Sequence, residues 1–228
     1  MSERIALVHA TALAIQPVCH AFSRLWPEAR LMNLLDDSLS ADRAAAGTLT
    51  AAMVARFVNL ARYCVDNGAG AILFTCSAFG PAIEAARAGV GVPVQKPNEA
   101  MLAEALDAAA AGRGKLALLA TFEPSVESIA AELRALAAAR AQPVELVTRY
   151  VPDAMAAANR GGAADAEQHD ALIAAAAAAW EEARDCDALM LAQFSMARAR
   201  DQVQSRSPAP VLVSTDSAVR AMRRAMRR

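Results

Sequence analysis

A cysteine stands just after a short apolar run, where a strand is expected to turn into a helix. Residues 71–74 are typical of a strand buried on both faces, and a helix is expected from about Ser77 to Arg87. Cys76 should therefore lie at a helix N-terminus, which lowers the pKa of a thiol and makes it a usable base or nucleophile near neutral pH. We take Cys76 as the candidate catalytic residue.

The same pattern recurs later in the chain with an amide in place of the thiol. Residues 187–197 align without gaps at an offset of 117, which places Gln193 at the position of Cys76. The offset also brings Pro93 onto Pro210 and Glu99 onto Asp216. The sequence therefore indicates an internal duplication in which one half has lost a reactive side chain, because a neutral amide cannot transfer a proton at a useful pKa.

Short apolar runs alternate with helical patterns along the whole chain, which predicts an α/β protein. We expect two similar lobes, each a parallel-rich sheet flanked by helices. The first should span residues 1–97 and be completed by 209–228, and the second should span 98–208. Strands are expected at 5–8, 31–35, 71–74, 93–94, 116–120, 144–147, 188–192 and 210–213.

In such sheets ligands bind beyond the carboxyl ends of the strands, and the side chains there are mostly polar. Free backbone N–H groups at the following helices favour an anionic substrate. Besides Cys76 and Gln193, the candidate site residues are His9, Thr11, Ser77, Thr121, Ser125, Phe194, Ser195 and Asp216. Cys19 and Cys64 fall on apolar helix faces and are expected in the core, whereas His169 is expected to be solvated.

Composition and motifs exclude several classes of protein. The formal net charge of −1 gives no general attraction to nucleic acid or anionic membranes. No nucleotide fingerprint or GxSxG elbow occurs, and the four cysteines lack metal-ligand spacing. No run is long enough to cross a bilayer, and the start of the chain lacks a signal peptide pattern. We expect a cytoplasmic protein whose partner is a small carboxylate. The sequence leaves open whether the protein forms a homo-oligomer.

Two segments resemble the aspartate/glutamate racemase superfamily, which includes hydantoin racemases, maleate isomerase and arylmalonate decarboxylase. Phe74-Thr-Cys76-Ser-Ala is similar to the first cysteine segment of that family, and Leu191-Ala-Gln193-Phe-Ser-Met-Ala197 to the second. The resemblance implies a site between two lobes, one cysteine from each, and no metal or pyridoxal cofactor. It also places Thr121 and Ser125 where family hydroxyls hold a carboxylate.

Three functions remain open on these grounds. The first is an isomerase-like enzyme in which Cys76 transfers a proton at the carbon next to a carboxylate. The second is stereospecific decarboxylation of a substituted malonate, with Phe74, Phe79, Phe122 and Phe194 as an apolar pocket. The third is a carboxylate sensor, in which Gln193 only hydrogen bonds the ligand.

Overall fold

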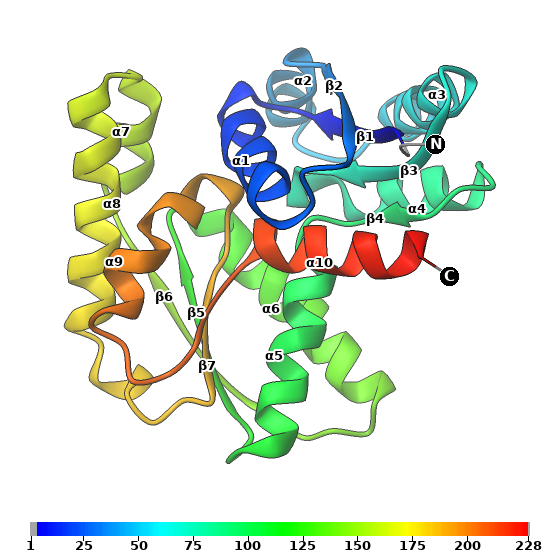
Figure 1. Ribbon diagram of the computed structural model, residues 1–228. Helices are drawn as coiled ribbons and strands as arrows, with labels where there is room; N and C mark the ends of the chain where they lie inside the picture. Colours follow the sequence, from blue (N-terminus) through cyan, green and yellow to red (C-terminus); the bar gives the residue numbers. More distant parts are fainter. Residues whose placement is uncertain (1–3, 228) are drawn as a thin grey trace. The chain divides into compact units, whose positions relative to one another are not determined.

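The computed structural model describes residues 4–227, and they form two compact units. The first unit takes its residues from Met1–Glu99 and Ala218–Arg228, and the second is Ala100–Ser217. The division falls inside two helices, α5 (Glu99–Ala111) and α10 (Ser214–Met226). Figure 1 follows the elements along the chain.

Each unit contains one parallel sheet of four strands, and the two sheets have the same strand order. In the first unit the order is β2-β1-β3-β4, with β1 (Arg4–His9), β2 (Arg30–Leu35), β3 (Ala69–Phe74) and β4 (Val94–Gln95). In the second it is β6-β5-β7-β8, with β5 (Lys115–Ala120), β6 (Glu145–Tyr150), β7 (Ala188–Leu191) and β8 (Val211–Val213).

The register of the strands confirms the duplication residue by residue. Ile72 pairs with Val94 in the first sheet, and Leu189 pairs with Val211 in the second, at the offset of 117 read from the sequence. The backbone N–H of Thr75 donates to Val8 O at 3.0 Å, and that of Ala192 donates to Leu119 O at 2.9 Å. The residues that follow, Cys76 and Gln193, therefore leave equivalent strands at equivalent points.

Helices cover the faces of each sheet because their apolar sides and the strands form one core per unit. In the first unit they are α1 (Ile15–Leu25), α2 (Ser38–Ala46), α3 (Ala51–Asp66) and α4 (Gly80–Ala88), with the 3-10 helices η1 (Ala12–Ala14) and η2 (Ser77–Phe79). In the second they are α6 (Glu123–Ala139), α7 (Ala154–Arg160), α8 (Ala163–Ala178) and α9 (Arg200–Gln204), with η3 (Glu181–Ala183) and η4 (Phe194–Ala199).

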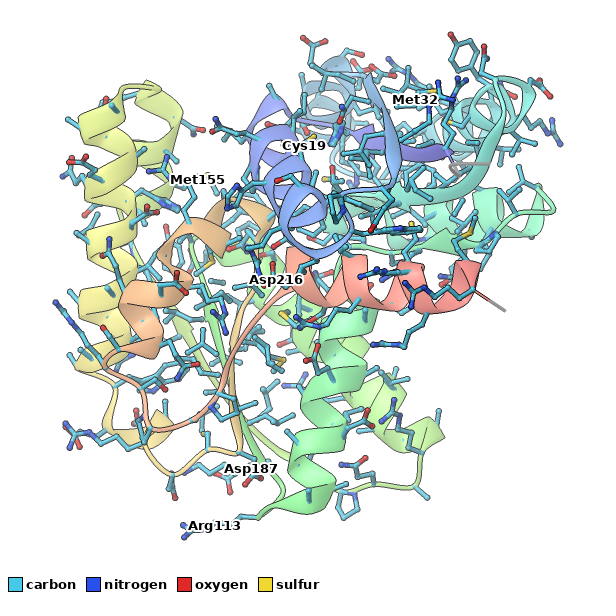
Figure 2. The ribbon with its side chains drawn as sticks, in the orientation of Figure 1. Cys19, Met32, Arg113, Met155, Asp187 and Asp216 are labelled. Carbon is cyan, nitrogen blue, oxygen red and sulfur yellow. The ribbon has the colours of Figure 1, made fainter. Side chains whose placement is uncertain are left out.

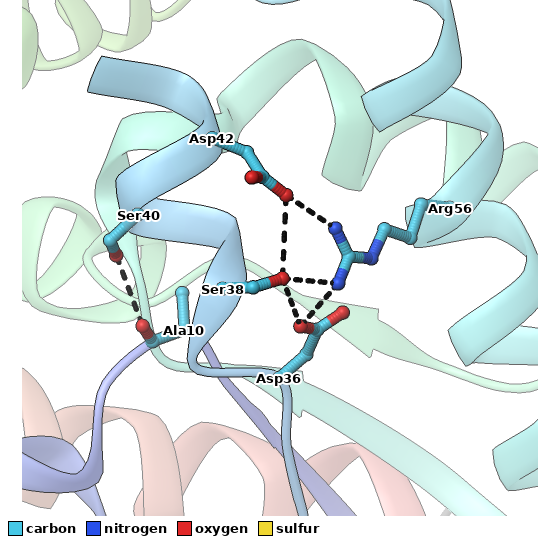
Figure 3. A network of polar contacts seen from close by, with 6 residues as sticks. All are labelled: Ala10, Asp36, Ser38, Ser40, Asp42 and Arg56. Carbon is cyan, nitrogen blue, oxygen red and sulfur yellow. Dashed lines mark hydrogen bonds and ion pairs between the residues drawn. The ribbon is translucent and has the colours of Figure 1, made fainter. Parts of the chain in front are cut away.

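Helix α2 is fastened beside the carboxyl end of β1 by a polar network (Figure 3). Arg56 donates to Asp36 at 2.5 Å, to Ser38 at 2.6 Å and to Asp42 at 2.8 Å. The hydroxyl of Ser40 donates to Ala10 O at 3.0 Å, while Leu39 is fully buried. This network fixes the segment that follows His9.

Asp187 lies at the end of the second sheet where β5 and β7 begin, away from the carboxyl ends of its strands (Figure 2). Its carboxylate accepts the backbone N–H groups of Arg113 and Lys115 at 2.9 and 3.0 Å. Burial raises the pKa of Asp187, but these two bonds and one from the Gly114 N–H together lower it by more. The pKa of Asp187 is therefore below its ordinary value. The turn before β5 is thus built around a charged side chain.

Two expectations about elements need correction. The last strand, β8, was expected to complete the first lobe as part of residues 209–228. It instead pairs with β7 of the second sheet, because Leu189 and Leu191 lie on the free edge of that strand. The helix expected from Asp165 to Arg184 ends at Ala178, since Trp180 turns into the core and is stacked by Arg149. Within residues 4–227, no helix combines the length and apolarity of a membrane span.

Candidate active site

Cys76 sits at the carboxyl end of β3, as the sequence predicts, but its environment differs from the expected helix N-terminus. It precedes η2, a single 3-10 turn, and is partly buried against the core of the first unit. Burial raises the pKa of the Cys76 thiol, and the N–H of Ala78, which hydrogen bonds the sulfur, lowers it by less. The expectation of a lowered pKa was therefore wrong, because one short turn does not offset the loss of solvent.

The same strand end is held by a buried histidine. His9 is fully buried, with Nδ1 at 2.8 Å from Thr75 Oγ1 and Nε2 at 3.0 Å from Asn33 Oδ1. Burial lowers the pKa of His9, more than the Asn33 contact raises it, so the neutral ring is favoured. Assigning Nε2–H as the donor to Asn33 leaves Nδ1 to accept the Thr75 hydroxyl proton. His9 therefore supports the residue before Cys76.

Cys19 extends this network from α1, where its Sγ lies 3.6 Å from Asn33 Oδ1. It is partly exposed, so the expectation of a core residue was wrong for Cys19, whereas Cys64 is fully buried as expected. Asn33 and Thr75 were not recognised in the sequence. Asn33 lies in β2 and Thr75 directly follows β3, the two strands that flank β1, so their nearness to His9 is evident only once the register is known.

In the second unit, Gln193 occupies the position equivalent to Cys76. Both residues precede a 3-10 helix with extended backbone angles, φ −124° and ψ 121° for Cys76 and φ −110° and ψ 151° for Gln193. Oε1 of Gln193 accepts the Thr121 N–H at 2.9 Å and the Thr121 hydroxyl at 3.2 Å. Its Nε2 donates to Ser125, whose hydroxyl donates to Phe122 O at 2.7 Å. The structure thus brings together Gln193, Thr121 and Ser125.

The remaining predicted residues are spread over both units. Ser77 opens η2 and Ser195 lies in η4, both partly buried. Thr11 caps η1 by accepting the Leu13 N–H. Asp216 is buried in the first turn of α10, with its Oδ1 3.5 Å from Thr215 Oγ1.

The aromatic residues expected to line an apolar pocket mostly belong to the core. Phe74 and Phe79 pack on Phe57 with ring centroids 5.2 and 4.8 Å away. Phe194 is also buried, and of the four only Phe122 is exposed. Three of these side chains therefore stabilise the fold.

A buried histidine in the second unit was missed. His169 on α8 is 3% exposed, so the expectation of a solvated side chain was wrong. Its Nδ1 lies 3.0 Å from Asp170 Oδ1, and Arg198 of η4 reaches Asp170 Oδ2 at 3.4 Å. Among the residues described, Nε2 of His169 has no hydrogen-bond partner. The cluster ties α8 to the segment that follows Gln193.

Comparison with known proteins now identifies the class. The family model of Asp/Glu/hydantoin racemases matches residues 9–222, so the chain belongs to this family. Membership supports an enzyme of the isomerase type found in this superfamily. A search of curated protein sequences gave no significant match.

Solved structures show the same fold at low sequence identity. Glutamate racemase isoform RacE1 from Bacillus anthracis is 14% identical with a TM-score of 0.70, covering 99% of this chain and 82% of its own. Allantoin racemase from Klebsiella pneumoniae is 15% identical at 0.70, covering 99% and 88%. An arylmalonate decarboxylase is 19% identical at 0.63, covering 97% and 92%. These likenesses establish the two-sheet architecture.

Proposed function

We propose that the protein is a cofactor-independent enzyme in which Cys76 transfers a proton at the carbon next to the carboxylate of a small acid. The observation that carries this proposal is the equivalence of Cys76 and Gln193 in the duplicated fold. The thiol occurs at the strand end in only one half. The chemistry supported is therefore one-base proton transfer, in contrast to a reaction with two thiols.

The thiolate of Cys76 would take the α-proton and become a thiol, while the C–H electron pair moves into the carboxylate and forms an enediolate. Returning a proton from sulfur to the same carbon completes the cycle. A raised pKa reduces the fraction of thiolate at neutral pH but makes that thiolate a stronger base. Exchange of the sulfur proton with water before its return would label the substrate.

Decarboxylation of a substituted malonate is the second candidate, because a single proton donor suffices once carbon dioxide has left. Its supposed apolar pocket loses support, since Phe74, Phe79 and Phe194 are buried in the cores. A carboxylate sensor is the third candidate, and it would not need the thiol of Cys76.

The test is a screen in deuterium oxide with both enantiomers of glutamate and aspartate, allantoin and phenylmalonate, followed by NMR and chiral chromatography. We expect deuterium at the α-carbon of one of these compounds. If the reaction is decarboxylation, α-methyl-α-phenylmalonate should give a single enantiomer of 2-phenylpropionate. Cys76→Ser should slow this turnover by about 100-fold or more. Cys186→Ser is the control, because Cys186 is a free thiol of the second unit, outside the network that supports Cys76.

Retained turnover in Cys76→Ser would refute the assignment of the base. Binding of an acid without exchange or decarboxylation, unchanged by Cys76→Ser, would support the sensor.

A further inference from the structure

The amide of Gln193 has a chemically determined orientation. The backbone N–H of Thr121 can only donate, so the atom it contacts at 2.9 Å must be the oxygen of the Gln193 side chain. The Thr121 hydroxyl donates to the same oxygen at 3.2 Å. The NH2 group must therefore face the other way, toward Ser125.

The two hydroxyls beside Gln193 are both engaged within the second unit. Thr121 gives its proton to Gln193 Oε1, and Ser125 gives its proton to Phe122 O at 2.7 Å. Ser125 can then only accept from Gln193 Nε2. Thr121 is fully buried and Ser125 is 6% exposed. In this arrangement neither hydroxyl proton is free to hold a carboxylate, the role expected from the family resemblance.

Gln193 itself retains one donor. Nε2 has two protons, and residues 4–227 offer a partner for one of them, Ser125. The side chain is only partly buried and lies at the carboxyl end of β7, where ligands of parallel sheets bind. Two donors on Oε1 polarise the amide and strengthen its remaining N–H as a donor.

We propose that Gln193 is a fixed hydrogen-bond donor that binds a carboxylate oxygen of the substrate, with Thr121 and Ser125 as its positioning residues. Gln193 would thus supply a binding group at the strand end of the second unit that is equivalent to the strand end carrying Cys76 in the first. A neutral amide gives up no proton, so this donor binds the carboxylate without changing its protonation state. The inference rests on the proposed function for the identity of the ligand as a carboxylate.

The experiment follows the side-chain amide signals of Gln193 by ¹⁵N–¹H NMR while malonate is added, using Cys76→Ala protein so that no turnover is needed. The signals are assigned by their loss in Gln193→Met. We expect one of the two NH2 protons to shift on addition of malonate and not on addition of malonamide. Signals unmoved by malonate would overturn the proposal.

Affinity provides the second measurement. Gln193→Met removes the donor, and Gln193→Glu keeps the acceptor for Thr121 while replacing the donor by an anionic oxygen. Both should raise the Kd of malonate, Gln193→Met by about 10- to 100-fold, as expected for a hydrogen bond to a charged group. Gln202→Met, on the exposed side of α9, is the matched control and should leave the Kd unchanged.

Wild-type affinity in both Gln193 variants would refute the binding role even if Cys76 proves essential for exchange. Conversely, malonate binding through Gln193 together with full exchange in Cys76→Ser would leave this inference standing and remove the proposed base.

Discussion

At the scale of single residues, the thiol of Cys76 sets the expected pH dependence. Burial raises its pKa, so the thiolate population at neutral pH is small and grows with each increment of pH. We expect kcat/KM for deuterium exchange to rise about tenfold per pH unit through neutrality and to level only above the ordinary thiol pKa of about 8.5. The rate of deuterium incorporation, followed by NMR at a series of pH values, measures this profile.

A plateau that begins below neutral pH would contradict this expectation, since it would require a base with a lowered pKa. Burial raises the pKa of Cys64 to about 11, so that thiol offers no such base. His9 has a lowered pKa, but its ring is fully buried and both of its nitrogens are engaged by Thr75 and Asn33.

The candidate site could be predicted in part from residue types alone. Cys76 and Gln193 were found because strand ends are marked by the change from apolar to polar residues. His169 was misplaced because α8 is rich in alanine and its buried side is hard to recognise. The signal was its spacing of one helical turn from buried Ile173. The engagement of Thr121 and Ser125 by Gln193 depends on side-chain geometry, which spacing does not encode.

At the scale of elements, the turn before β5 gives a prediction about stability. A Cβ added to Gly112 would lie 2.0 Å from Asp187 Oδ1, and that carboxylate cannot move away without losing the N–H groups of Arg113 and Lys115. Gly112→Ala should therefore lower the free energy of unfolding by about 1–3 kcal/mol. Urea denaturation followed by circular dichroism measures the change.

Gly91→Ala is the matched control, because no atom lies within 4 Å of its added Cβ. A double-mutant cycle with Asp187→Ala isolates the cause: once the carboxylate is gone, Gly112→Ala should cost much less. Equal costs in the presence and absence of Asp187 would show that the clash is not responsible.

The elements themselves were largely predictable, and the exceptions have physical causes. Buried parallel strands are marked by short apolar runs, so all eight runs correspond to strands of the structure. Local sequence does not say which sheet a short strand joins, and the Val211–Val213 strand pairs with β7 through a long-range register. Likewise, Trp180 ends α8 by packing into the core, a tertiary effect that overrides helix propensity.

At the scale of the whole chain, duplication makes the two halves comparable position by position. The register at Ile72–Val94 recurs at Leu189–Val211, so the backbone offers the same strand end twice. The side chains placed there differ in chemistry: a thiol can exchange a proton, whereas a neutral amide can only donate and accept hydrogen bonds. Under the two proposals above, the duplicated backbone carries one reactive position and one binding position, and substitution can reverse this asymmetry.

Gln193→Cys tests that asymmetry directly. The new thiol takes the place equivalent to Cys76 and frees Thr121 and Ser125 from Gln193. The family resemblance implies one acid–base thiol from each lobe, so we expect the variant to racemise the acid that the wild type only exchanges or produces as one enantiomer. Because the variant also lacks the proposed Gln193 donor, its exchange should be slower by about 100-fold. Chiral chromatography alongside NMR exchange separates the two effects.

Racemisation by the wild type itself would show that another residue already serves as the second base. His9 would be a poor choice for that role, because both of its ring nitrogens are hydrogen bonded and the ring is fully buried. Ser195 would be the first residue to replace, because it is partly exposed in η4, two residues after Gln193. Ser195→Ala should then abolish racemisation while leaving the one-base exchange by Cys76 intact.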